Sequence, residues 1–179
     1  MIILVGASAS GKTEVAKELK KKYDIQKVVT HTTRSCRIHE IPDVDYHFVD
    51  TDLFLKLKDE NYFVETTQYN GNYYGTSKKE IADNKCLIVD PNGLHAFQAL
   101  HDPHIVSFLL IASEKLRRQR MASRGDTTIN IEKRIENDRV SFSKENIGTI
   151  DYIIDTETLS IEEVTTLVMK YYQEKLKKI

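Results

Sequence analysis

Residues 6–13 read Gly-Ala-Ser-Ala-Ser-Gly-Lys-Thr, and the apolar run 1–5 (Met-Ile-Ile-Leu-Val) comes directly before them. They match the pattern G-x-x-x-x-G-K-[ST], and residues 13–23 continue with amphipathic helical spacing. A buried strand, a loop of small residues and a helix in this order form a phosphate-binding loop, whose backbone N–H groups surround phosphate oxygens. The stretch therefore predicts a nucleoside triphosphate site; the alternative is a small-residue loop that matches the pattern by chance.

We take the triphosphate to be ATP and expect the whole loop to hold it, through Gly6, Ala7, Ser8, Ala9, Ser10, Gly11, Lys12 and Thr13. The helix that follows points the positive end of its dipole at the phosphates. We expect Lys12 to reach the β- and γ-phosphates and the hydroxyl of Thr13 to bind Mg²⁺.

The 179-residue chain has the composition of one folded domain, with 40% hydrophobic and 30% charged residues. Its 26 basic and 27 acidic residues give a net charge of −1, which argues against nucleic acid or an anionic membrane as partner. We see no apolar run of about 20 residues and no secretory leader, so we expect a cytoplasmic protein without a membrane span. The two cysteines, Cys36 and Cys86, are then expected to be reduced.

Apolar runs and amphipathic segments alternate along the chain, which indicates an α/β fold with a parallel sheet flanked by helices. The expected strands are 1–5, 26–30, 86–89, 105–111 and 152–154, and the expected helices are 13–23, 77–84, 94 onward, 114–121, 131–143 and 160–178. The stretch 31–76 breaks this alternation, with expected strands at 45–49 and 62–67, a helix at 51–58 and a hairpin turn at Asn70-Gly71. We expect one domain, with a core of about 1–30 and 77–179 and an inserted subdomain of about 31–76.

Four motifs lie in order within the inserted stretch. They are T-T-R-S-C-R at residues 32–37, D-Y-H-F-V at 45–49, an acid at Glu65 after an aromatic strand, and G-N-Y-Y-G-T at 71–76. Together with the phosphate-binding loop they resemble the guanylate kinase family, from residue 2 to about 175. The resemblance implies a P-loop nucleoside monophosphate kinase that phosphorylates GMP to GDP with ATP and Mg²⁺, and an insertion that binds the acceptor nucleotide.

The residue types in these motifs suit a nucleotide acceptor. Two arginines three residues apart, with tyrosine hydroxyls, can clamp a phosphate by charge-assisted hydrogen bonds. We expect the 5′-phosphate of GMP to be held by Arg34, Arg37, Tyr46 and Tyr74. A carboxylate suits guanine because guanine offers N1–H and N2–H side by side, whereas adenine has an acceptor at N1. The resemblance implies Glu65 as the guanine reader, with Thr30, Thr76 and Asp90 as helpers.

The chain departs from the family pattern at three positions. At the segment around residues 86–93 the family pattern resembles L-L-D-I-D-x-Q-G, with two acids. Asp90 matches the second acid, but Ile88 stands in place of the first. We assign Asp90 to guanine, with a share in placing Mg²⁺ through water, while a helix N-cap is its structural alternative. Ala7 and Ala9 stand where the family usually has Pro and Gly. We expect the loop to form with these small residues, and a positive φ at Ala9 to weaken binding.

A basic segment follows the strand expected at 105–111. Arg120 and Arg124 are four residues apart on one helix face, and Arg134 follows after a polar break. The resemblance implies that these three arginines close over the triphosphate as a lid of about 120–136 and act in catalysis with Lys12 and Arg34. A solvated basic helix is the alternative. Nearby, Arg117, Arg118 and Arg139 are expected to be surface groups.

Two other functions stay open at this stage. One is a P-loop kinase of the same fold that phosphorylates another acceptor, such as a sugar phosphate, and needs no guanine reader. The other is a non-catalytic guanylate-kinase-like module that binds a phosphopeptide in the acceptor cleft. Small-molecule nucleotides are the expected partners, and the protein is expected to be a monomer or a homodimer.

Overall fold

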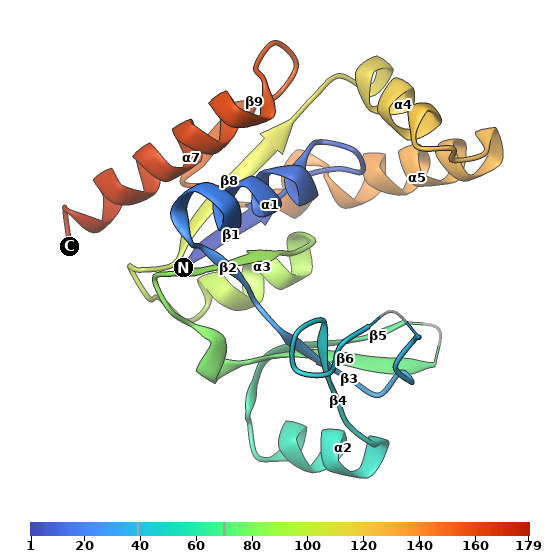
Figure 1. Cartoon of the computed structure of the whole chain (residues 1–179), viewed down its shortest axis with the longest axis vertical. Coiled ribbons are helices and arrows are strands. Elements are labelled where there is room, and N and C mark those ends of the chain that lie inside the picture. Colours follow the sequence, from blue (N-terminus) through green and yellow to red (C-terminus); the bar gives the residue numbers. More distant parts are fainter. Residues whose placement is uncertain (39, 70) are drawn as a thin grey trace.

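The computed structural model describes residues 1–38, 40–69 and 71–179, and it contains two sheets (Figure 1). The larger is parallel and has the strand order β2-β7-β1-β8-β9. Its strands are β1 (Ile2–Val5), β2 (Gln26–Lys27), β7 (Lys85–Ile88), β8 (Val106–Ile111) and β9 (Tyr152–Asp155). The expected α/β class, with a parallel sheet flanked by helices, is confirmed.

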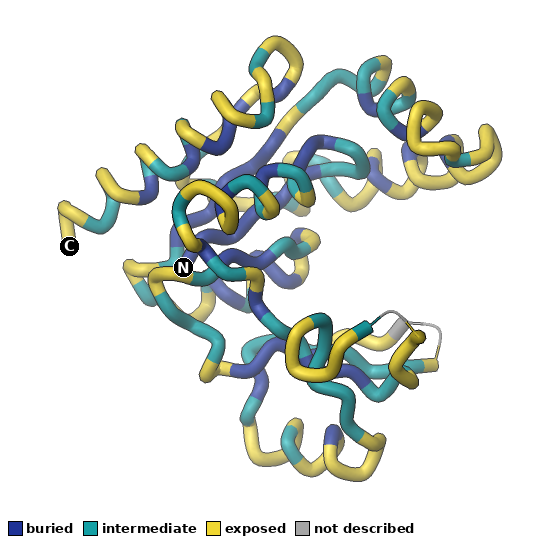
Figure 2. The backbone as a smooth tube through the Cα atoms, in the orientation of Figure 1, coloured by how far each residue is buried: buried dark blue, intermediate teal, exposed yellow. Residues whose placement is uncertain are grey.

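Strand β1 lies at the centre of this sheet because every residue of its apolar run is buried on one face or the other. Ile2 and Leu4 face a core cluster with α1 (Lys12–Tyr23) and α7 (Ile161–Leu176). The alternate residues Met1, Ile3 and Val5 face a second cluster that includes Leu94 and Phe97 of α3 (Pro91–Gln98). Figure 2 shows the buried residues concentrated along these strands, while the outer faces of the helices are exposed.

The remaining helices of the core are α4 (Glu114–Ser123), α5 (Thr128–Ser141) and α6 (Lys144–Ile147). Helices α4 and α5 pack against each other through Met121, Ile131 and Ile135. The last helix, α7, begins with a capping box of Ser160 and Glu163. Among the described residues, none of the helices is both long enough and apolar enough to cross a membrane.

The second sheet is built from the part of the chain that interrupts the alternation. Its order is β4-β3-β6-β5, from β3 (Thr30–Thr32), β4 (Tyr46–Phe48), β5 (Phe63–Tyr69) and β6 (Asn72–Ser77), with α2 (Thr51–Asp59) packed on it. Strands β5 and β6 pair antiparallel on either side of the expected turn at Asn70-Gly71. Residue 70 lies outside the described residues.

Two expected elements differ from the structure. The single strand expected at 26–30 is divided: β2 pairs with β7 in the parallel sheet, and β3 pairs in the second sheet. The helix expected at 77–84 is only one 3-10 turn, Lys78–Glu80. It ends there because the chain must reach the parallel sheet, where Asn84 O accepts from the backbone N–H of Gln26.

Helix α2 is held on the second sheet by the aromatic ring of Phe54. Phe54 is the buried residue of this helix, and its ring stacks on Phe63 at 4.7 Å and on Tyr73 at 5.4 Å between centroids. Gly75 makes room for it, since a Cβ there would lie 3.1 Å from Phe54 Cζ.

We therefore predict that Phe54→Ala lowers the free energy of unfolding by about 3–5 kcal/mol, because it removes a fully buried ring and leaves a cavity. Urea unfolding followed by circular dichroism measures this loss. The matched control is Leu53→Ala on the same helix, where the side chain is 42% exposed and the loss should stay within about 1 kcal/mol. Equal losses in the two variants would contradict the assignment of Phe54 as the anchor of α2.

Candidate functional site

The loop between β1 and α1 leaves little room for side chains. Gly6 has φ 150°, and a Cβ there would lie 2.4 Å from the carbonyl oxygen of Leu110 on β8. Gly11 has φ 104° and is the N-cap of α1. In the described part of the chain no side chain caps this helix, so the N–H groups of its first turn are available to an anion.

Lys12 folds back over this loop. Its Nζ donates to the carbonyl oxygens of Gly6 at 2.5 Å and Ala7 at 2.8 Å. The pKa of Lys12 is lowered to about 8, chiefly by burial; the charge of Asp138 opposes this shift, and Arg117 and Arg124 add to it. Thr13, the next residue, is exposed at the start of α1. The cation and the hydroxyl expected at a triphosphate site therefore lie together at the helix N-terminus.

Ala9 adopts the left-handed backbone conformation, with φ 60°. For a residue with a Cβ this conformation costs about 1–2 kcal/mol. The loop forms nevertheless, as expected, and the backbone N–H of Ser10 donates to Ala7 O at 3.2 Å. Ala9 also packs against the cluster that joins α4 and α5. The weaker binding expected from a positive φ stays a prediction.

The three arginines expected in a lid lie in different surroundings. Arg120 on α4 donates to Ala9 O at 3.1 Å and to Thr156 O at 2.9 Å, so it braces the loop. Arg124 caps the C-terminus of α4, is exposed and acts on Lys12 through its charge. Arg134 on α5 is exposed, and its Nη1 lies 3.7 Å from Oδ2 of Asp126.

The expectation that Arg117 is a surface group is wrong. It is only 8% exposed, and its Nη1 lies 2.7 Å from Oδ2 of Asp138, which is also 8% exposed. Sequence reasoning missed Asp138, although a signal was present. It follows Ile131 and Ile135 at the spacing i, i+4, i+7, so it occupies a core position of α5. Arg118 and Arg139 do pair with acids on the surface.

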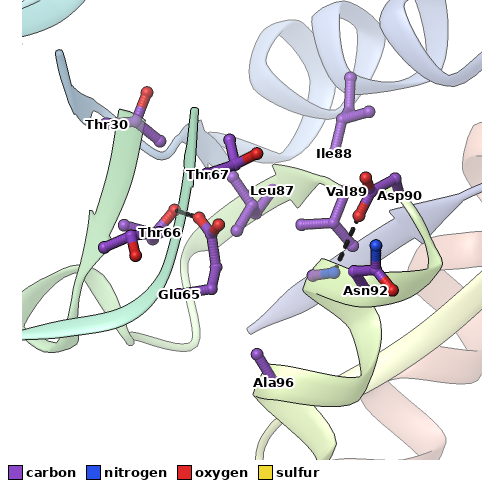
Figure 3. Close-up of a pocket in the computed structure, with 12 residues that line it drawn as sticks. Thr30, Glu65, Thr66, Thr67, Leu87, Ile88, Val89, Asp90, Asn92 and Ala96 are labelled. Carbon is purple, nitrogen blue, oxygen red and sulfur yellow. Dashed lines mark hydrogen bonds between the residues drawn. The ribbon is translucent and has the colours of Figure 1, made fainter. Parts of the chain in front are cut away.

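A cavity of about 560 Å³ lies between the second sheet and the segment that runs from the end of β7 into α3 (Figure 3). It is lined by all four residues assigned to guanine, which are Thr30, Glu65, Thr76 and Asp90. They come from β3, β5, β6 and the end of β7, so residues 60 positions apart in sequence meet in one space. Figure 3 shows Glu65 and Asp90 on opposite sides of this space.

The two acids of the cavity are held differently. Thr76 Oγ1 donates to Glu65 Oε1 at 2.6 Å, while burial raises the pKa of Glu65 and the charge of Asp90 adds to this. Asp90 Oδ1 accepts from the backbone N–H of Gly93 at 2.8 Å and caps α3. Asp90 is therefore the helix N-cap that was its structural alternative, and it also lines the cavity. Helix α3 begins at Pro91, three residues before the expected start.

Three of the four residues assigned to the acceptor phosphate lie together. The guanidinium of Arg34 lies 5.4 Å from the centre of the Tyr46 ring, and the Tyr46 and Tyr74 rings are 6.2 Å apart. The side chain of Arg37 is exposed at the edge of this group. Sequence reasoning missed Glu40, whose carboxylate accepts from Arg34 at 2.6 and 3.0 Å and from the backbone N–H of Arg37.

Ile88 ends β7 and packs into the core cluster on the α1 side. Its side chain is directed away from Glu65 (Figure 3). Across residues 1–38, 40–69 and 71–179, no three His, Cys, Asp or Glu side chains gather as a metal site of their own would need. Thr13 could hold a metal at the loop through its hydroxyl, together with phosphate oxygens, a donor set that suits Mg²⁺.

Comparison with known proteins agrees with this geometry. The family model described as guanylate kinase matches residues 1–174. The chain belongs to the guanylate kinase family. It is 32% identical over 169 residues to guanylate kinase from Anaplasma phagocytophilum (strain HZ), covering 89% of this chain and 80% of that protein. It is also 32% identical over 163 residues to guanylate kinase from Schizosaccharomyces pombe, covering 86% and 81%.

A solved structure supports the same assignment. The crystal structure of the Anaplasma phagocytophilum guanylate kinase superimposes with a TM-score of 0.68 at 25% sequence identity. The match covers 98% of this chain and 85% of the other. The family resemblance predicted from the sequence motifs is therefore confirmed.

We predict that the pKa of Lys12 in the ligand-free protein is about 8, well below the 10.5 of an ordinary lysine. The unfolded chain then binds more protons between these values, so this group makes the free energy of unfolding rise as pH increases through that window. A ¹³C NMR titration of the lysine Cε resonances measures the pKa, and Lys12→Met assigns the signal. A midpoint above 10 would contradict the burial of the ammonium group.

Proposed function

We propose that this protein transfers the γ-phosphoryl group of ATP to GMP and releases ADP and GDP. The observation that carries the proposal is the pairing of two sites in one fold. A phosphate-binding loop with a buried lysine lies on the parallel sheet, and an acid-walled cavity with an arginine and tyrosines beside it lies against the second sheet. Membership of the guanylate kinase family supports this reading.

On the donor side the chain supplies cations and N–H groups. The loop residues Gly6 to Thr13 would surround the phosphates of ATP, and Lys12 would leave its two carbonyl partners for the β- and γ-phosphates. The lid of about 120–136 would bring Arg124 and Arg134 over the triphosphate, while Arg120 already holds the loop. Bound with ATP, Mg²⁺ would neutralise charge on the phosphates, with Thr13 as its protein ligand.

On the acceptor side the cavity matches the edge of guanine. Glu65 and Asp90 present acceptors from opposite walls to the N1–H and N2–H donors, and Thr30 and Thr76 add hydroxyl groups. Adenine would place an acceptor against a carboxylate and leave buried polar groups unpaired. The 5′-phosphate would then lie against Arg34, Tyr46 and Tyr74, with Arg37 closing from the edge.

The chemistry follows from charge rather than from a general base. The attacking group is a phosphate oxygen of GMP, which is ionised near neutral pH because the second pKa of a phosphate monoester is about 6. Transfer of the γ-phosphoryl group has a loose transition state, so positioning and neutralisation dominate. We propose that the insertion of about 31–76 and the lid move together over both substrates, which excludes water and prevents hydrolysis of ATP.

Ile88 replaces an acid that could orient water around Mg²⁺, and it leaves Thr13, the proposed protein ligand of the metal, in place. Without an acid at this position, only Asp90 of the two matching positions could orient water on Mg²⁺, and its Oδ1 already caps α3. We propose that Asp90 acts mainly on guanine and shares in placing Mg²⁺ through water.

The decisive test is a coupled assay of ADP release with a panel of acceptors: GMP, AMP, a sugar phosphate and ribose bisphosphate. We expect turnover with GMP that exceeds the other acceptors by at least about 100-fold, since a mismatched base leaves buried polar groups unpaired. Lys12→Ala should abolish transfer with the fold intact, and the exposed Lys17→Ala on α1 is its matched control. Preference for a sugar phosphate would favour the other kinase, and phosphopeptide binding without product would favour the non-catalytic module.

We predict that Glu65→Gln lowers the GMP-over-AMP preference by at least about tenfold, because an amide replaces one acceptor by a donor at the guanine edge. The ratio of kcat/KM for the two acceptors measures the effect, while KM for ATP should stay within twofold. Glu80→Gln, at an acid paired with Lys85 outside the cavity, is the matched control. An unchanged ratio in Glu65→Gln would overturn the role of Glu65.

A further inference from the structure

A carboxylate from helix α5 reaches the phosphate-binding loop. Asp138 on α5 accepts from the backbone N–H of Ser8 at 2.9 Å through Oδ2 and from the Ser8 hydroxyl at 3.2 Å through Oδ1. The two residues are 130 positions apart in the sequence. None of the motifs noted in the sequence includes residue 138, so this contact is additional to the expected site.

The carboxylate is fixed in its turn by a cation. Arg117 on α4 donates to Asp138 Oδ2 at 2.7 Å, and both residues are 8% exposed. A buried ion pair costs desolvation and is retained only where its geometry is well satisfied. Here the pair links three segments, α4, α5 and the loop, around one carboxyl group.

The backbone conformation of Ala9, the residue after Ser8, explains why the loop needs to be held in place. Ala9 holds φ 60°, a conformation that a residue with a Cβ adopts only when its surroundings impose it. Its neighbours are held on both sides: Ser8 by Asp138, and Ser10 O by the hydroxyl of Thr156 at 3.1 Å. The carbonyl of Ala9 itself accepts from Arg120 at 3.1 Å.

We propose that Asp138 is a positioning residue of the phosphate-binding loop: it holds Ser8 from helix α5 and so keeps the strained turn at Ala9 in the shape that receives the triphosphate. Asp138 acts through the loop and does not touch the phosphates itself. The same contact ties the loop to the helices that carry the lid arginines. The inference rests on the proposed use of ATP.

The test is a pair of comparisons by calorimetry of ATP binding, which needs no turnover. Asp138→Ala should weaken ATP binding at least tenfold in the natural background. In an Ala9→Gly background the same substitution should weaken it threefold or less, because glycine adopts the positive φ without an anchor. Equal losses of ATP affinity in the two backgrounds would overturn the proposal, because a general structural defect would weaken binding equally with Ala or Gly at residue 9.

Two further variants keep the result independent of stability. Arg117→Met combined with Asp138→Leu replaces the buried ion pair by apolar side chains, which preserves folding. This double variant should still bind ATP at least tenfold more weakly, and ATP binding at the natural level would overturn the proposal. Glu136→Ala on the same helix, at an exposed acid paired with Arg139, should leave ATP binding within twofold. Failure of the unmodified protein to bind ATP would instead reject the proposed function.

Discussion

The turn between β1 and α1 is the constraint on which the rest of the structure depends. Its backbone must direct N–H groups toward one anion, and this requires left-handed φ values at Ala9 and Gly11. Such a turn does not persist by itself when a residue with a Cβ occupies it. It persists here because β1 is buried in the centre of the sheet and because Asp138, Arg120 and Thr156 bond to three successive residues of the loop.

Charge is distributed in opposite ways at the two ends of the site. Cations are concentrated near the loop. Burial lowers the pKa of Lys12, and the neighbouring Arg117 and Arg124 add to this effect. The cavity proposed to bind guanine carries two acids, and burial together with the charge of Asp90 raises the pKa of Glu65. These opposite charges suit the groups proposed to bind there: phosphates at the loop, and N–H donors at the two acids.

Local patterns predicted the elements that have a strong period or a strong terminator. The apolar run of β1, the last helix α7 and the hairpin of β5 and β6 all lie where the sequence predicted them. Boundaries were less well predicted where chain direction changes between the sheets. Residues 26–30 read as one strand, yet they serve two sheets, and the polar stretch 77–84 reads as a helix, yet it must return the chain to β7. The spacing of apolar residues along the chain shows neither the change from one sheet to the other nor the return to β7.

From residue order alone the fold class and the glycine-rich loop after β1 could be predicted, and candidate side chains could be named for each end of the site. These follow from residue type and short spacing, because backbone N–H groups, a lysine and paired arginines suit phosphate wherever they occur. Only the tertiary structure decided which of these groups meet. It placed Thr30, Glu65, Thr76 and Asp90 around one cavity, buried Arg117, and joined Asp138 to a loop 130 positions away. Such contacts depend on how separate helices and sheets pack, and packing is a property of the whole chain rather than of any segment.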